Sequence, residues 1–169
     1  MKLESLKDLY LEQLRDLYSA ETQLVEALPK MAEAASLPEL QKGFKDHLRQ
    51  TEGHVKRLET VFKGLGEDPE GQTCAGMKGL IKEGTEMIKT KGEPDVIDAG
   101  LIAAAQRVEH YEIAGYGTVC TYAEMLGHAD HHKLLGTTLE EEKETDLKLT
   151  KLAVTKVNTS AAAEPVAAR

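Results

Sequence analysis

The sequence contains no tryptophan, and aromatic residues make up only 4% of its 169 residues. The signals of β-strands, such as alternating polar and apolar runs and Asn-Gly hairpin turns, are also scarce. No apolar run approaches the length of about 20 residues that a transmembrane helix needs. What remains are long blocks rich in Ala, Leu, Glu, Lys and Gln, and these residues favour helix. We therefore predict an all-α protein with no membrane-spanning segment.

Positive charge and cysteine are both in short supply. The chain carries 21 Lys and Arg against 29 Asp and Glu, for a net charge of −8. General binding of nucleic acid needs a basic surface, so we do not expect it here. Cys74 and Cys120 lie far apart and form no Cys-x-x-Cys pair, which argues against a disulfide framework. The first residues are amphipathic and mixed in charge, unlike a signal peptide. Together these features predict a cytoplasmic location.

The hydrophobic pattern predicts one domain over residues 1–158 and a disordered, Ala-rich tail over residues 159–169. Apolar residues at helical spacing predict four long helices, at about residues 3–35, 38–63, 94–126 and 130–158. Pro29 falls inside the first helix, where we expect a bend.

The ends of these helices also carry signals. We expect Ser36 to cap the second helix, with Glu39 completing a capping box, and Asp130 to cap the fourth helix. Gly127 is the expected stop of the third helix. A crossover of roughly thirty residues, containing a short helix from Cys74 to about Thr90, joins the second helix to the third. The fold class is thus an antiparallel four-helix bundle with a long crossover.

Three of the four long helices carry a glutamate where the apolar repeat calls for Leu or Ala. These are Glu21, Glu112 and Glu142. Glu109 lies one turn before Glu112, and Asp146 lies one turn after Glu142, so each pair shares a helix face. Counting residues back from the predicted turns places the acids at about one height in the bundle.

Carboxylates in an apolar core are costly unless they are paired, protonated or bound to a cation. A cluster of four would be neutralised by two divalent ions, and carboxylate-rich ligation suits iron or manganese. Ferritin-like dinuclear sites are built in this way from the helices of a four-helix bundle. The alternative for any one of these glutamates is a position on the solvated face of its helix. The run Glu140-Glu141-Glu142 is mostly such a face.

The histidines divide by position. His54 matches the height of Glu21 and is a candidate ligand, with Glu52, or no ligand at all, as the alternatives on the second helix. We expect His47 to form hydrogen bonds at the edge of the core. Four other histidines are expected on outer faces or in a loop: His110, His128, His131 and His132. The candidate metal ligands are Glu21, His54, Glu109, Glu112, Glu142 and Asp146.

Several segments also carry a likeness to a known family. They are residues 16–21 (DLYSAE), 27–32 (ALPKMA), 104–114 (AAQRVEHYEIA) and 138–146 (TLEEEKETD), with His47-Leu48, Thr51 and Arg57-Leu58-Glu59 between them. Over about residues 1–155 the chain resembles the YciF-type family of bacterial, stress-associated, ferritin-like proteins. This resemblance implies a four-helix bundle with a dinuclear metal site, and a homodimer.

More distantly, the ligand pattern resembles that of rubrerythrin. Glu21, Glu109, Glu112 and Glu142 match its glutamate positions, but Thr145 stands where that site uses histidine, and the chain has no Cys-x-x-Cys electron relay. These departures argue against a peroxidase. Our first hypothesis is a non-haem di-metal protein that acts on O2 or peroxide, or handles iron, during stress. The alternative is a non-catalytic dimeric stress or partner-binding bundle whose metal site is vestigial.

Overall fold

The computed structural model describes residues 3–71 and 73–163, and every regular element in them is helical. The elements are α1 (Leu6–Ala34), α2 (Pro38–Leu65), α3 (Ala75–Lys89), α4 (Pro94–Met125), α5 (Ala129–Leu152), the π-helix η1 (Ala153–Val157) and α6 (Asn158–Ala161). The prediction of an all-α protein is confirmed. No helix in these ranges combines the length and the hydropathy needed to cross a membrane.

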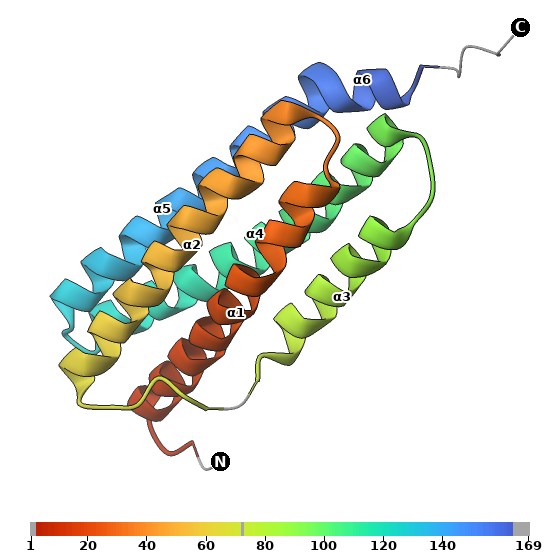
Figure 1. Ribbon diagram of the computed structural model, residues 1–169. Helices are drawn as coiled ribbons and strands as arrows, with labels where there is room; N and C mark the ends of the chain where they lie inside the picture. The colour runs from red at the N-terminus through yellow and green to blue at the C-terminus, as the bar shows by residue number, and fades with distance from the viewer. Residues whose placement is uncertain (1–2, 72, 164–169) are drawn as a thin grey trace, which may run out of the picture.

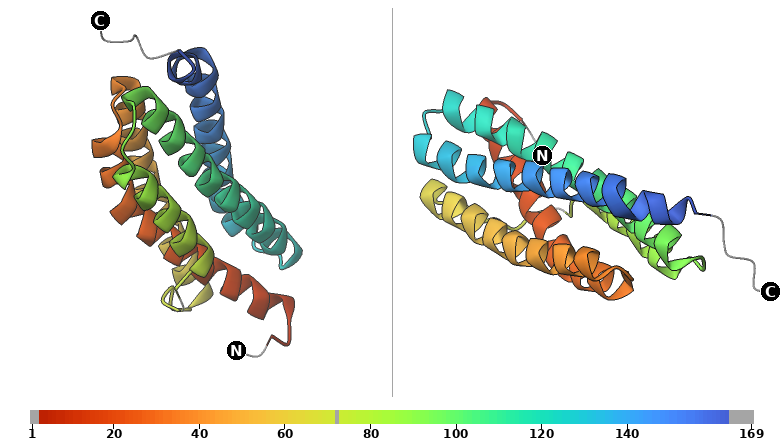
Figure 2. Two further views of the ribbon diagram at one scale, coloured as in Figure 1. Left: turned by 90° about the vertical axis from the view of Figure 1, so that its right-hand side faces the viewer. Right: turned by 90° about the horizontal axis from the view of Figure 1, so that it is seen from above.

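The four long helices form two antiparallel hairpins, α1–α2 and α4–α5, that face each other across the core (Figures 1 and 2). The crossover carries α3 along the outside of α1 and α4, so that α4 runs in the same direction as α2 (Figure 1). This is the predicted four-helix bundle with a short helix in the long connection. Gly115 of α4 allows a close approach to α1, because a Cβ there would lie only 2.7 Å from Leu17.

The turn between α1 and α2 is held by a residue that the sequence did not suggest. The carboxylate of Asp98, from α4, accepts hydrogen bonds from the backbone N–H groups of Ser36 (2.8 Å) and Leu37 (2.7 Å). Leu37 is the N-cap residue of α2 and makes no side-chain cap, so the predicted Ser36 cap and capping box are wrong. A buried carboxylate offers two charged acceptors to two amides, which a local hydroxyl cannot match.

The other helix ends agree more closely with the sequence. Pro29 lies inside α1, and the helix continues to Ala34. Gly127 follows α4 with a φ of 78°, as expected of a stop residue. Asp130 does not cap α5, because the helix already begins at Ala129 and Asp130 sits in its first turn. There its charge still complements the helix dipole.

The last predicted helix is divided. It continues from α5 through η1 into α6 and ends at Ala161, beyond the predicted limit at residue 158. Residues 164–169, where most of the predicted disordered tail falls, lie outside the described residues. The first helix, predicted from about residue 3, begins only at Leu6, and Leu3 before it is 51% exposed.

The core has two apolar halves with a polar layer between them. One half surrounds Leu28, Phe44 and Leu101, and the other surrounds Leu14 and Phe62. The layer between them consists of buried polar side chains from all four long helices of the bundle. It contains Glu21, His47, Thr51, His54, Glu109, Glu112, Thr138, Glu142 and Thr145.

Candidate metal centre

Five of the six predicted ligands lie in this polar layer. Glu21, His54, Glu112 and Glu142 are fully buried, and Glu109 is 2% exposed. The apolar residues on either side of each one in the helical repeat bury that face of its helix, and the glutamates are buried with them. The helices therefore bring the acids to one height, as the residue counting predicted.

One group of donor atoms lies around His54. Its Nδ1 is 3.2 Å from Oε1 of Glu21 and 2.9 Å from Oε1 of Glu142. These three residues place ligand atoms within 4.8 Å of one another. Tyr116 of α4 fixes the position of Glu21, because its hydroxyl donates a 2.5 Å hydrogen bond to Oε1 of that glutamate.

A second group lies beside the first, around His47. Its Nε2 is 3.3 Å from Oε1 of Glu109 and 3.8 Å from Oε2 of Glu142. Glu112 completes this group, and its ligand atoms also fall within 4.8 Å of one another. Glu142 belongs to both groups: its Oε1 faces His54 and its Oε2 faces His47. A carboxylate in this position is able to bridge two cations.

The buried side-chain atoms of the layer that could bind a metal lack hydrogen-bond partners. Among the described residues, no hydrogen bond reaches either oxygen of Glu112 or Glu142, Oε2 of Glu21 or Glu109, Nδ1 of His54 or Nε2 of His47. The short N···O approaches at the two histidines do not have hydrogen-bond geometry. An unsatisfied buried polar group costs about 1–3 kcal/mol, and a charged one costs more. So many buried oxygen and nitrogen atoms that face one another without hydrogen-bond partners fit a site built around cations.

Electrostatics give the same indication. Burial, with Glu142 and Glu21 nearby, raises the pKa of Glu109 and of Glu112 well above the ordinary value, and burial also raises the pKa of Glu21. Burial opposes ionisation of Glu142 too, but its contacts with the two histidines hold its pKa below the usual value. Without a cation, the layer must therefore retain protons on some of its carboxyl groups.

The two histidines differ in charge. Burial alone would lower the pKa of His54, but its contacts with Glu142 and Glu21 raise that pKa to about 10. Burial lowers the pKa of His47, so its ring is neutral near pH 7. A metal ion between His54 and the two glutamates would take the place of the imidazolium proton.

Two residues outside the polar layer, Glu141 and Arg57, orient His54. Nε2 of His54 is 2.9 Å from Oε2 of Glu141, which accepts its N–H. Arg57 in turn donates to both oxygens of Glu141, at 2.6 and 2.9 Å. This arrangement fixes the tautomer, leaving Nδ1 for a cation. The sequence places Glu141 in a run of mostly solvated residues, but its side chain is only 27% exposed and is held by His54 and Arg57 of α2.

His47 is oriented in a similar way by Thr145. The Thr145 hydroxyl donates to the backbone carbonyl of Glu141, so its oxygen is free to accept from Nδ1 of His47, 3.4 Å away. Nε2 of His47 then remains bare toward Glu109. His47 of α2 thus lies beside Thr145, the position where the rubrerythrin pattern has histidine on the fourth helix.

Two of the sequence interpretations change at this point. His47 was expected at the core edge, yet it is only 4% exposed and belongs to the second group. The spacing of His47, Thr51 and His54 by four and three residues puts them on one helix face, which was a usable signal. Glu52, the alternative ligand on this helix, is exposed.

Asp146 lies outside both groups. Its side chain is 19% exposed, accepts a 2.9 Å hydrogen bond from Gln106 and lies 3.4 Å from His110. It remains close enough to raise the pKa of Glu109, although burial and the nearer glutamates have larger effects.

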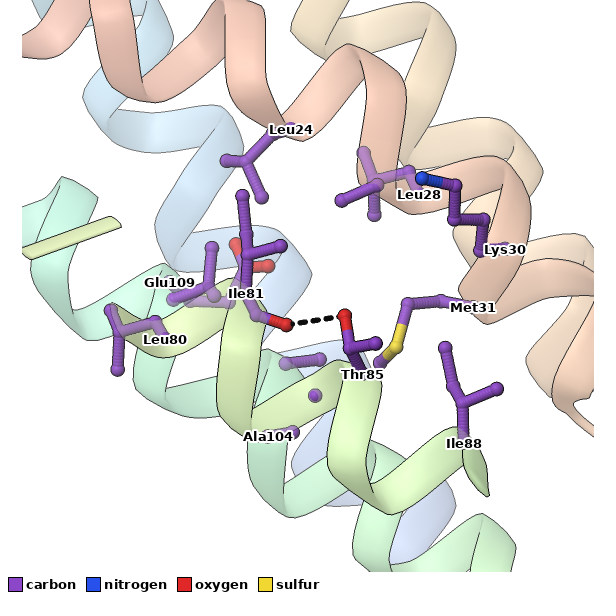
Figure 3. Close-up of a pocket in the computed structure, with 14 residues that line it drawn as sticks. Leu24, Leu28, Lys30, Met31, Leu80, Ile81, Thr85, Ile88, Ala104 and Glu109 are labelled. Carbon is purple, nitrogen blue, oxygen red and sulfur yellow. Dashed lines mark hydrogen bonds between the residues drawn. The ribbon is translucent and has the colours of Figure 1, made fainter. Parts of the chain in front are cut away.

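A narrow apolar pocket of about 50 Å³ reaches the layer from the side that α3 covers. Glu109 is the one carboxylate in its lining and lies behind Ile81 in Figure 3. The labelled apolar side chains of this pocket are Leu24, Leu28 and Met31 of α1, Leu80, Ile81 and Ile88 of α3, and Ala104 of α4 (Figure 3).

Comparison with known proteins places the chain in a family. Residues 5–162 match the family model described as "Domain of unknown function (DUF892)". The chain belongs to this family. Protein YciF of Escherichia coli is 46% identical over 162 residues, covering 95% of this chain and 98% of that protein. The predicted YciF-type resemblance is confirmed.

Solved structures show the same architecture. The crystal structure of the E. coli stress protein YciF, a ferritin-like fold, superposes with a TM-score of 0.89 at 46% identity, covering 92% of this chain and 99% of that one. YcfI from Rhodopseudomonas palustris gives 0.85 at 46% identity, covering 88% and 95%. A Xanthomonas campestris protein gives 0.74 at 16% identity, covering 93% and 96%, and this likeness shows the fold alone. This DUF892 protein is thus a ferritin-like four-helix bundle.

Proposed function

We propose that this DUF892 protein holds two divalent metal ions, iron or manganese, in the polar layer. The observation that carries the proposal is the set of bare, buried donor atoms that converge from four helices. Glu21, His54 and Glu142 would hold one ion. His47, Glu109 and Glu112 would hold the other, with Glu142 between the two. Four carboxylates balance the charge of two divalent cations, which offsets the cost of burying them.

We propose further that the centre acts on O2 or peroxide, or handles iron, under stress. A pair of iron ions would supply the electrons that reduce such an oxidant. The protein's own side chains have other roles: Glu141 and Arg57 hold the His54 tautomer, Tyr116 holds Glu21, and the apolar halves of the core exclude water. The apolar pocket that ends at Glu109 suits a small uncharged oxidant. The description of E. coli YciF as a stress protein supports a role under stress.

Anaerobic titration with Fe(II), followed by admission of air, tests this proposal. We expect saturation at two irons per chain, and then an oxidation band in the near-ultraviolet. Saturation well below two irons, with no band on admitting air, would count against the proposal.

A second candidate is a non-catalytic bundle with a vestigial site. The observation that favours it is the high pKa of His54, about 10, because an imidazolium between Glu21 and Glu142 lets part of the layer balance its charge without a metal. Thermal melts with EDTA, Fe(II) or Mn(II) separate the two candidates. A ligand that binds only the folded state stabilises it by about 2.7 kcal/mol at a hundred times its Kd. An unchanged melting temperature would favour the second candidate.

We also propose a homodimer in the cytoplasm. The family resemblance implies the dimer, and two free, buried cysteines suit a reducing compartment. Sedimentation equilibrium of the full chain should give twice the mass of one chain, and a mass of one chain would contradict the dimer.

A further inference from the structure

A groove between α2 and α5 leads from solvent to one end of the proposed metal centre. Its volume is about 440 Å³, and His47, Glu109 and Thr145 lie among its lining residues. Because His47 and Glu109 are nearly fully buried, they form its deep end. Nε2 of His47 and Oε2 of Glu109 are two of the bare donor atoms of the layer. The groove therefore reaches two residues that carry unpaired buried atoms of the layer.

In the part of the chain that the structure describes, the opposite end of the layer meets neither this groove nor the pocket beside α3. Glu21 and His54 are fully buried, and neither residue lines the groove. Tyr116 covers Glu21 on one side, and Glu141 with Arg57 covers the outer nitrogen of His54. The two ends of the centre therefore differ in access.

The mouth of the groove is basic, although the protein as a whole is acidic. Lys42, Lys148, Lys151 and Lys156 line it, against two carboxylates, Glu39 and Asp46. Lys42 contacts Asp46, Lys156 contacts Glu39, and Lys148 lies 3.3 Å from Glu144, outside the lining. Lys151 forms no ion pair with the described residues. In a chain with a net charge of −8, this excess of positive charge at one opening favours the approach of anions.

The walls below the lysines are apolar, formed by Leu40, Phe44 and Leu149 among others. Such walls limit the water around a ligand that has passed the mouth, which strengthens its interaction with a cation at the deep end. We propose that a small anion enters through this groove and binds at the His47–Glu109 end of the centre, while the Glu21–His54 end stays closed to it. This inference rests on the proposed metal centre.

Azide is the probe for this inference, because it is a small anion that gives a charge-transfer band with ferric iron. The iron-loaded, oxidised protein is titrated with azide, and the band is expected to saturate at one azide per chain. In the double variant Lys148→Glu and Lys151→Glu, the azide Kd should rise about tenfold or more, since two attractive charges become repulsive. The matched control, Lys78→Glu with Lys89→Glu on the exposed face of α3, changes net charge equally and should leave the Kd unchanged.

A second variant narrows the groove without changing charge. Gly43 lines the groove, and a Cβ built there meets nothing within 4 Å, so Gly43→Phe adds bulk to the lining from a position whose Cβ has room. We expect azide to bind several-fold more slowly to this variant. Gly136→Phe is the control, because Gly136 of α5 also has open space around its Cβ and does not line the groove.

Nitric oxide, a neutral ligand of ferrous iron, should bind the lysine variant as it binds the wild type. Iron content is measured in every sample, so a failure of the proposed metal centre can be told apart from a failure of anion entry through the groove. Wild-type protein that binds no iron contradicts the proposed function and this inference with it. If the protein binds two irons per chain, but the lysine variant leaves the azide Kd unchanged or Gly43→Phe leaves the rate of azide binding unchanged, only this inference is contradicted.

Discussion

At the scale of single residues, the main feature is a set of acids that a metal-free core could not hold fully ionised. Glu112 is the extreme case, since it is fully buried and neither carboxylate oxygen has a hydrogen-bond partner. Its position in an apolar helical repeat made it visible in the sequence. His47 was less visible, because it lies about two turns before His54, and counting residues matched only His54 to the height of Glu21. Glu141 and Arg57 depend on contacts between helices, which no local pattern records.

Replacing Glu112 with Leu should abolish binding at the second metal position while preserving or raising the stability of the metal-free protein. The variant removes an unpaired buried acid and adds apolar burial. Comparable replacements leave the free energy of unfolding unchanged or raise it by about 1–4 kcal/mol. Urea unfolding in EDTA and metal analysis measure the two effects. Glu52→Leu, at an exposed position of α2, is the control and should keep full metal content. A Glu112→Leu protein that fails to fold would show that this side chain is a structural partner.

The same pair of proteins gives a pH test. In the metal-free wild type, the folded state holds the Glu112 proton above the ordinary carboxyl pKa of 4.5, while the unfolded chain has lost it. Stability therefore falls as pH rises above that value, and Glu112→Leu removes this loss. The stability gap between variant and wild type should widen with pH, by at most about 1.4 kcal/mol per unit. His54 loses its own contribution between pH 6.5 and about 10 in both proteins. A gap that stays constant from about pH 5 to about pH 8 would contradict the raised pKa.

At the scale of helices, local signals predicted most of the architecture. The apolar repeats predicted the limits of the long helices to within a few residues, with Pro94 at the start of α4 and Gly127 after its end. The predicted Ser36 cap was wrong because the stronger acceptor, Asp98, comes from a helix sixty residues away. Interactions of this kind depend on tertiary contact, so no window along the sequence contains them.

Asp98→Ala should destabilise the protein by about 2–4 kcal/mol, because the backbone N–H groups of Ser36 and Leu37 lose the charged acceptor that holds the α1–α2 turn. Asp98 lies away from the polar layer, so metal stoichiometry should not change. Asp95→Ala, in the exposed first turn of α4, is the control and is expected to cost well under 1 kcal/mol. Urea unfolding of the three proteins measures the difference. Equal stabilities for the two variants would mean that Asp98 does not hold the α1–α2 turn.

At the scale of the whole molecule, the bundle is two apolar half-cores that enclose one polar layer. The apolar halves drive folding, and the crossover with α3 closes one side of the bundle (Figure 1). The layer opposes folding unless its charges are compensated, so the proposed metal ions would add to the stability of the folded protein. The chain shares its fold with E. coli YciF at a TM-score of 0.89, and the proposed function rests on the polar layer inside that fold.

The most direct test is anomalous X-ray diffraction from crystals grown with Mn(II). The account predicts two anomalous peaks inside the bundle in each chain. One should lie among Glu21, His54 and Glu142, and the other among His47, Glu109, Glu112 and Glu142. Anomalous peaks confined to carboxylates on the surface, with the buried donors still facing one another without an ion, would contradict it.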